Sequence, residues 1–165
     1  MLKINKRELI GFIFTVVIGS LMHFVYEWTG GNSVVGIIAP VNESTWEHLK
    51  LLFYPSALFS VAAYLLNKTK KNYITVKAFS ILAGMFSIVI IFYTYTGIIG
   101  QNFLWADILT FIIGAAVVYY MSEKKLKDLK LGNVPGIIVL LSMVLLFILF
   151  TFNSPSIGLF EDPLI

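Results

Sequence analysis

The chain contains no cysteine among its 165 residues. This absence excludes disulfides, thiolate metal ligands, iron–sulfur clusters and cysteine nucleophiles. Charge is scarce as well, because Asp, Glu, Lys and Arg make up 13% of the residues, about half their share in a soluble domain. The formal net charge of +3 gives no case for a nucleic-acid partner.

The motifs of common hydrolases and nucleotide-binding proteins are also missing. The chain has no His-Glu-x-x-His pair, no Gly-x-Ser-x-Gly elbow, no P-loop and no Gly-x-Gly-x-x-Gly turn. Trp46-Glu-His-Leu-Lys50 places a glutamate beside one histidine, but it does not put two histidines on one helical turn. Any site in this protein therefore lies outside the standard patterns.

Apolar residues are abundant, at 58% of the chain with a mean hydropathy of +0.87. Five apolar runs are separated by short polar patches, and each is near the roughly 20 residues that cross a hydrocarbon core about 30 Å thick. Since unpaired backbone groups are costly in lipid, each run is expected to be helical. We predict an all-α integral membrane bundle that forms a single membrane domain over residues 1–165. Its five transmembrane helices are predicted at about 9–28, 46–66, 73–99, 103–121 and 134–152.

Basic residues predict the orientation of this bundle. Of the twelve Lys and Arg residues, eleven lie in segments 3–7, 68–77 and 124–130, which the five-helix topology puts on one side. Only Lys50 lies on the other side. Because basic residues accumulate in cytoplasmic loops, we expect the N-terminus in the cytoplasm and the C-terminus outside.

The opposite, external end gathers the acids and histidines. Both histidines and six of the nine acids fall there: His23, His48, Glu27, Glu43, Glu47, Asp107, Glu161 and Asp162. His23 and Glu27 are four residues apart and share a helix face. From Leu9 to His23 a helix rises about 21 Å, which leaves His23 below the outer hydrocarbon surface, and Asp107 reaches a similar depth. Ionisable residues at such depth indicate a functional site.

Imidazole and carboxylate groups are suitable ligands for Zn²⁺, Mn²⁺ or Fe²⁺. The candidate metal ligands are His23, Glu27, Glu43 and His48. The candidate catalytic residues are Glu47, Asp107 and Lys50. In this scheme a carboxylate acts as general base, Lys50 holds an anionic headgroup, and the cofactor is a divalent metal such as Zn²⁺.

Each of these residues also has an interpretation without chemistry. Ser44 and Glu47 fit the Ser-x-x-Glu capping box, which satisfies backbone amides at a helix start. Lys50 is placed to pair with Glu47 three residues earlier. His48 lies at the predicted interface, where solvent or lipid headgroups can surround it.

His23 and Asp107 can likewise serve in a structural hydrogen bond between helices. The external aromatic residues are expected to form an interfacial belt: Tyr26, Trp28, Trp46 and Trp105. Lys77 is expected to extend its ammonium to the cytoplasmic surface.

Three strings indicate a family. His23-Phe-Val-Tyr-Glu-Trp28, Pro40-Val-Asn-Glu-Ser-Thr-Trp-Glu-His-Leu-Lys50 and Phe160-Glu-Asp-Pro163 resemble a family of small bacterial multi-pass membrane proteins classed as a domain of unknown function. The Asn-Glu-Ser-x-Trp-Glu-His string is the most specific of them. The resemblance covers nearly the whole chain and implies a bacterial plasma-membrane protein, but no activity. The signature residues it implies are His23, Glu27, Asn42, Glu43, Trp46, Glu47 and His48.

Three functions compete at this point. The first is a membrane-embedded, metal-assisted enzyme acting on a lipid or envelope precursor from the outside. The second is a small proton-coupled or ion transporter that works as a dimer, although the cytoplasmic half shows no continuous relay. The third is an accessory or assembly protein with no chemistry of its own. The expected partners are the lipid bilayer, a lipid or envelope substrate and a further copy of the chain in a homo-oligomer.

Overall fold

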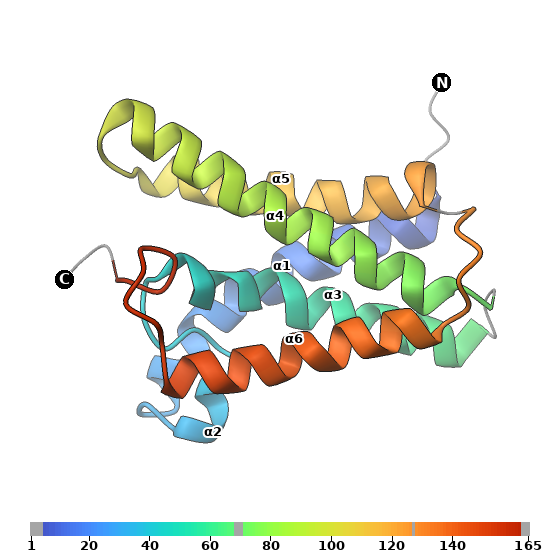
Figure 1. Ribbon diagram of the computed structural model, residues 1–165, viewed down its shortest axis with the longest axis horizontal. Coiled ribbons are helices and arrows are strands. Elements are labelled where there is room, and N and C mark those ends of the chain that lie inside the picture. The colour runs from blue at the N-terminus through green and yellow to red at the C-terminus, as the bar shows by residue number, and fades with distance from the viewer. Residues whose placement is uncertain (1–4, 68–70, 127, 163–165) are drawn as a thin grey trace.

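A computed structural model describes residues 5–67, 71–126 and 128–162, and every regular element in these ranges is a helix (Figure 1). The helices are α1 (Lys6–Trp28), α2 (Ser33–Gly36), α3 (Thr45–Asn67), α4 (Tyr73–Ile99), α5 (Leu104–Tyr120) with its π-helical extension η1 (Met121–Lys125), and α6 (Val134–Phe152). Five of these helices are long and apolar enough to cross a membrane. The predicted all-α, five-helix fold is confirmed, with each predicted span within a few residues of a helix.

Local sequence signals set several helix ends. The Asn5 side chain accepts a hydrogen bond from the Arg7 amide and caps the start of α1. Asn32 caps α2 in the same way, through the Val34 amide. Gly100 ends α4 with φ of +84°, a left-handed conformation that glycine adopts without strain. The short polar loops therefore interrupt the apolar runs at defined residues.

The helices pack in two connected groups. α1 packs on α3 and α5, while α4 packs on α5, α3 and α6. The core between them includes Leu52, Phe53, Ile81, Val118 and Phe147, all almost fully buried. α3 and α4 are thus the most enclosed helices, and α6 lies at the periphery.

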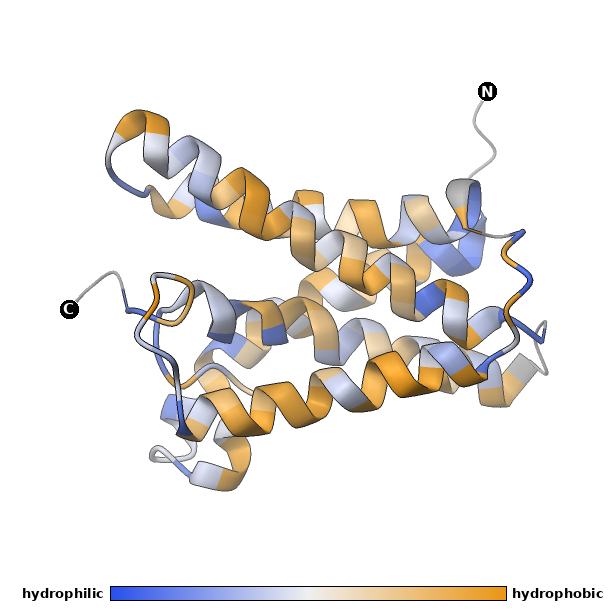
Figure 2. Cartoon of the chain, in the orientation of Figure 1, coloured by the Kyte–Doolittle hydropathy of each residue, from blue (hydrophilic) through white to orange (hydrophobic). Residues whose placement is uncertain are grey.

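Burial is inverted relative to a soluble protein. Large apolar side chains cover much of the outer surface, among them Ile10, Val17, Phe86, Ile90, Leu141 and Leu145. Polar and charged side chains are instead found inside, among them Glu8, Thr15, Glu47, Lys50, Ser56 and Lys77. Hydrophilic residues otherwise collect at the two ends of the bundle (Figure 2). A bundle that meets lipid along its sides has this distribution.

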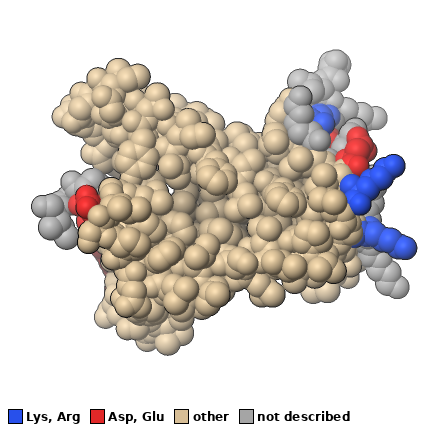
Figure 3. Space-filling model, in the orientation of Figure 1, with Lys and Arg blue, Asp and Glu red and all other residues tan. Residues whose placement is uncertain are grey.

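The two ends differ in charge. We call the end where α1 begins and α3 ends the basic end, because Lys6, Arg7, Lys71, Lys124 and Lys130 lie there. Lys and Arg side chains gather at this end in Figure 3. We call the opposite end, where α1 ends and α3 begins, the histidine end, because it carries both histidines. Of the other basic residues predicted for these loops, Lys3, Lys68, Lys70 and Lys127 lie outside the described residues.

The segment after α6 folds back over the start of α3. The Trp46 amide donates to the Leu159 carbonyl at 2.9 Å, and the Trp46 ring packs on Phe147 and Phe160 with centroids 5.0 Å away in each case. Trp46 is therefore a core residue, and its assignment to an interfacial belt is wrong. Trp28 and Trp105 are about two-thirds exposed, as a belt requires.

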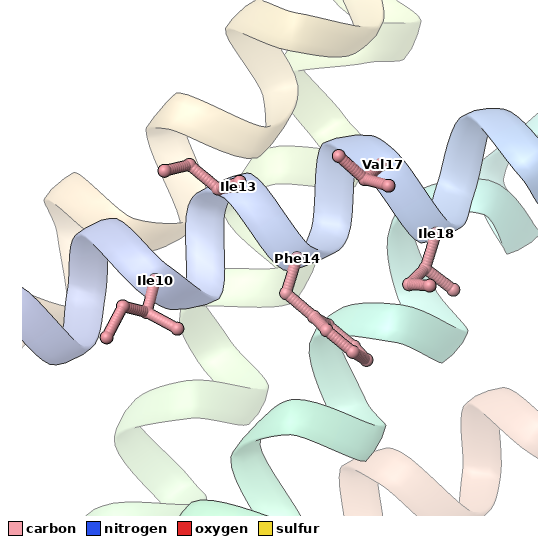
Figure 4. A pocket seen from close by; sticks show the side chains of 5 residues that line it. All are labelled: Ile10, Ile13, Phe14, Val17 and Ile18. Carbon is pink, nitrogen blue, oxygen red and sulfur yellow. The ribbon is translucent and has the colours of Figure 1, made fainter.

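An apolar hollow of about 330 Å³ lies along α1, lined by Ile10, Ile13, Phe14, Val17 and Ile18 (Figure 4). These side chains offer no polar group for chemistry. The hollow belongs to the lipid-facing side of the bundle.

Candidate functional site

Three of the four predicted metal ligands meet at the histidine end. His23 lies in the last turns of α1, His48 lies in the first turn of α3, and Glu43 precedes that helix. One ligand atom from each residue lies within 4.8 Å of the others. We call His23, Glu43 and His48 the donor group.

The backbone fixes the chemical role of His48. Its Nδ1 lies 3.0 Å from the Ser44 carbonyl oxygen, which can only accept, so Nδ1 carries a proton and donates. Its Nε2 lies 3.4 Å from Glu43 Oε2. In a neutral ring Nε2 then presents a lone pair to a carboxylate, and two acceptors at this distance repel unless a cation lies between them. The cation is either a proton on Nε2 or a metal ion.

Glu43 is ready to serve as the anionic ligand. The hydrogen bond from His48 lowers the pKa of the Glu43 carboxyl, and the charges of His48 and His23 act in the same direction. Partial burial opposes these effects by raising the pKa, but the net pKa is below its ordinary value. Glu43 therefore stays ionised near neutral pH.

His23 contributes a nitrogen with no internal partner. Its Nδ1 is buried and makes no hydrogen bond to the part of the chain that the structure describes. Its ring lies 5.2 Å from the ring of His48, centroid to centroid, at an interplanar angle of 43°. A buried polar atom left unpaired costs about 1–3 kcal/mol. A ligand that this nitrogen can bind removes that cost.

The spacing fits a tetrahedral metal ion. Donors about 2.1 Å from Zn²⁺ are about 3.4 Å from one another, which is the separation found between His48 and Glu43. The His23 ligand atom lies within 4.8 Å of the other two. Two histidines and one carboxylate are a known ligand set for catalytic zinc, and they leave the fourth position open for water.

The fourth predicted ligand, Glu27, is not part of the donor group. Its side chain is exposed, one turn after His23 on α1. Asp107 approaches instead from the first turn of α5. Its carboxylate accepts hydrogen bonds from the Tyr95 hydroxyl and from Asn102, and its charge acts on His48. Asp107 is therefore an acid on a third helix whose charge reaches the donor group.

Glu47 and Lys50 form a buried ion pair next to the donor group. Lys50 Nζ lies 2.5 Å from Glu47 Oε2, and both side chains are almost completely buried. Lys50 also donates to the Gly36 carbonyl at 2.7 Å and to Thr151 Oγ1 at 2.7 Å. All three ammonium protons thus have acceptors in the protein. The pairing predicted from the sequence is confirmed, and the catalytic roles of Glu47 and Lys50 stay predictions.

The capping box forms only in part. Ser44 Oγ accepts from the Glu47 amide at 3.4 Å, as the motif predicts. The Glu47 carboxylate does not return to Ser44 but accepts from the Val41 amide at 3.0 Å. It thereby ties the segment before α3 to the helix. The Glu43 amide donates to Asp162 Oδ2 at 3.2 Å, which adds the C-terminal segment to the same support.

Sequence reasoning missed two contributors to this arrangement. Thr151, on α6, bonds both Lys50 and Glu47 Oε1, the latter at 3.1 Å. The Ser44 carbonyl orients His48. A threonine a hundred residues away gives no signal in the sequence, whereas the carbonyl four residues before a helical histidine is a position that helix geometry brings close.

These features define the class: an all-α multi-pass membrane protein with a polar cluster at one end of its bundle. The chain belongs to a family described as Family of unknown function (DUF6512), whose model matches residues 1–165. No curated protein and no solved structure matches it. Membership of a family of unknown function is thereby confirmed. Within the third string that carried the resemblance, Pro163 lies outside the described residues.

Proposed function

We propose that this protein is a membrane-embedded enzyme that uses a divalent metal, with Zn²⁺ as the best fit, to hydrolyse an ester in a lipid or envelope precursor. The observation that carries the proposal is the donor group, His23, Glu43 and His48, whose ligand atoms converge within 4.8 Å. The unpartnered His23 nitrogen and the orientation of His48 Nε2 toward Glu43 support the proposal.

The chemistry follows from the open fourth position. Zinc held by the donor group would supply a bound water that loses its proton near neutral pH, and we assign the role of general base to Asp107, whose charge acts on His48. The water oxygen would bond to the ester carbonyl carbon, the bond from that carbon to the alcohol oxygen would break, and Asp107 would pass the proton to the leaving alcohol. Lys50 has no proton free for a substrate, so we propose that it positions the segment before α3.

The setting favours a substrate with an apolar tail. Phe24, Trp28, Trp105 and Ile108 are exposed apolar residues around the helix ends that carry His23 and Asp107. The basic residues at the opposite end support a cytoplasmic N-terminus in a bacterial plasma membrane. The histidine end then faces outward, where lipid headgroups and envelope precursors are within reach.

Metal analysis of the purified protein tests the first part of the proposal. Wild-type protein equilibrated with micromolar zinc and desalted is expected to retain one ion per chain by mass spectrometry. His23→Ala and His48→Ala should each weaken zinc binding by at least about tenfold. The matched control is Glu27→Gln, an acid one turn from His23 but outside the donor group, which should bind as wild type does. Wild-type protein without stoichiometric metal would remove the proposal.

Hydrolysis of long-chain acyl esters in detergent tests the second part. Chelation should abolish turnover and zinc should restore it. Asp107→Asn should lower kcat by about a hundredfold or more while metal content stays at one ion per chain. Full activity after chelation, or after His48→Ala, would show that hydrolysis does not depend on this site.

A further inference from the structure

A second buried polar cluster lies at the basic end. Lys77 Nζ, from α4, lies 2.5 Å from Glu8 Oε2 of α1 and 2.9 Å from Ser122 Oγ of η1. Ser122 also donates to Glu8 Oε2 at 2.6 Å. Lys77 is 1% exposed and Glu8 is 7% exposed. The expectation that Lys77 extends to the surface is therefore wrong, because a carboxylate inside the bundle binds its ammonium.

A buried ion pair such as Glu8–Lys77 contributes little net free energy to folding. Removing two charges from water costs several kcal/mol per ion, and apolar residues of similar size often stabilise a fold as well or better. Ionisable groups inside a membrane bundle commonly belong to ion or proton pathways. The charged and phenolic groups around Lys77 and Glu8 are Arg7, Tyr73, Tyr119 and Glu123.

A chain of hydroxyl groups continues from this cluster toward the middle of the bundle. The Tyr119 ring lies beneath Lys77 Nζ, 4.9 Å from it to the centroid. The Tyr119 hydroxyl lies 2.6 Å from Thr15 Oγ1, which lies 3.2 Å from Ser56 Oγ. These three residues come from α5, α1 and α3, so the chain follows the junction of three helices.

The direction of these hydrogen bonds can reverse. In both contacts of Thr15 either oxygen can be the donor. The buried Ser80 hydroxyl differs, because it donates to the Val76 carbonyl of its own helix at 2.8 Å and that oxygen can only accept. A proton can pass along hydroxyls only where each oxygen can accept from one neighbour and donate to the next.

The same junction leads on to the histidine end. Thr15, Gly19 and His23 follow at four-residue spacing on α1, and Ser56 lies eight residues after His48 on α3. About 12 Å along the helix axes therefore separates the Thr15–Ser56 contact from the two histidines. Between them Gly19 packs closely against the Leu51 backbone and the Phe111 ring. The side chains of Gly19, Leu51 and Phe111 cannot carry a proton.

We propose that the junction of α1, α3 and α5 is a proton path through the membrane, closed in this structure by the layer at Gly19 and Phe111. Protons pass between the Glu8–Lys77–Ser122 cluster and the Tyr119 hydroxyl, then through Thr15 to Ser56. Each hydroxyl oxygen gains one proton as it gives up another, so none keeps a charge. Water completes the path from Lys77 to Tyr119 and across the Gly19 layer when the layer opens. The membrane potential drives the movement, which does not require the metal.

Proton flux into liposomes that hold the purified protein and a pH-sensitive dye tests this path. Under a potassium diffusion potential of about 100 mV, wild-type protein should acidify the lumen faster than protein-free liposomes do. Tyr119→Phe and Thr15→Val keep the shape of each side chain but remove its hydroxyl, and each should lower the flux at least about tenfold. Ser80→Ala is the matched control, because it removes a buried hydroxyl outside the path and should leave the flux unchanged.

Zinc content separates this proposal from the hydrolase proposal. Tyr119→Phe and Thr15→Val should still bind one zinc, which also shows that they fold, and His48→Ala should lose zinc. A wild-type flux equal to that of protein-free liposomes overturns the path. So does an unchanged flux in both hydroxyl variants when each elutes from a size-exclusion column as wild type does. If one variant fails to fold by this measure, the other decides the outcome.

Discussion

At the scale of single residues, His48 is the side chain on which the metal proposal depends. The Ser44 carbonyl holds its Nδ1, and this hydrogen bond directs Nε2 toward Glu43. A metal-binding histidine usually has its second nitrogen held in this way. The other neutral tautomer, with its proton on Nε2, would present a donor to the site and bind no metal.

The pH dependence of zinc binding should separate the histidines from Glu43. Imidazoles must be neutral to bind a metal, so zinc binding is expected to weaken as pH falls from about 8 to about 6. The pKa of Glu43 is below its ordinary value, so its carboxylate is ionised throughout this window and takes up no proton itself. Glu43→Gln should weaken zinc binding at least about tenfold at pH 8, where the imidazoles are neutral.

Competition with a chromophoric chelator at several pH values measures these affinities. Glu27→Gln is again the control, with wild-type affinity and slope expected. Wild-type zinc affinity in Glu43→Gln would show that this carboxylate is not a ligand.

At the scale of elements, the start of α3 is held from three directions. Lys50 bonds the Gly36 carbonyl at the end of α2 and Thr151 on α6, while Glu47 bonds the Val41 amide. The Trp46 amide bonds the C-terminal segment. Glu43 lies just before the start of α3, so its position relative to His48 depends on the contacts that this start makes with α2, α6 and the C-terminal segment.

The contact between α4 and α5 gives a prediction at this scale. A Cβ on Gly84 would lie 2.7 Å from the Gly114 carbonyl oxygen and 3.1 Å from Leu52 Cδ2. The Gly114 oxygen belongs to the backbone of α5, so it cannot move away by a side-chain rotation. Gly84→Ala is therefore expected to destabilise the fold by about 1–3 kcal/mol. Thermal unfolding of the purified protein in detergent measures the loss.

Gly97→Ala is the matched control on the same helix. No atom lies within 4 Å of a Cβ at Gly97, so this variant should be as stable as wild type or slightly more stable. Equal unfolding temperatures for Gly84→Ala and Gly97→Ala would show that α4 and α5 accommodate the added Cβ at Gly84 with no loss of stability.

At the scale of the whole molecule, the two ends of the bundle have different polar chemistry. The basic end carries exposed cations at the surface (Figure 3), and the Glu8–Lys77 pair is buried inside it. The histidine end carries the donor group, Asp107 and the Glu47–Lys50 pair. A membrane protein with this asymmetry is expected to have one fixed orientation.

Cysteine labelling tests that orientation directly, since the chain contains no cysteine of its own. Ser154→Cys, beyond the end of α6, should react in intact cells with a membrane-impermeant maleimide. Lys124→Cys, at the basic end, should react only after the cells are opened. The reverse pattern would place the histidine end in the cytoplasm and remove external precursors as substrates.

Most residues of the candidate site could be predicted from the sequence, but the contacts between them could not. Glu43, Glu47 and His48 lie within six residues, so their proximity is a local property of the helix start. The convergence of His23 with them is not local, and Glu27, one turn further along α1, stays outside the donor group. The inclusion of His23 and the exclusion of Glu27 depend on how α1 packs against α3.

The sequence by itself determined the five helices, their approximate ends and the separation of basic from acidic residues, because hydropathy, length and loop charge are local properties. Only the tertiary structure decided which residues meet inside: His23 with His48, Lys77 with Glu8, Thr15 with Tyr119, and Trp46 with the C-terminal segment. The physical reason is that a membrane helix is apolar nearly all round. Its periodicity therefore does not mark the face that packs, and close contacts between distant helices make that choice.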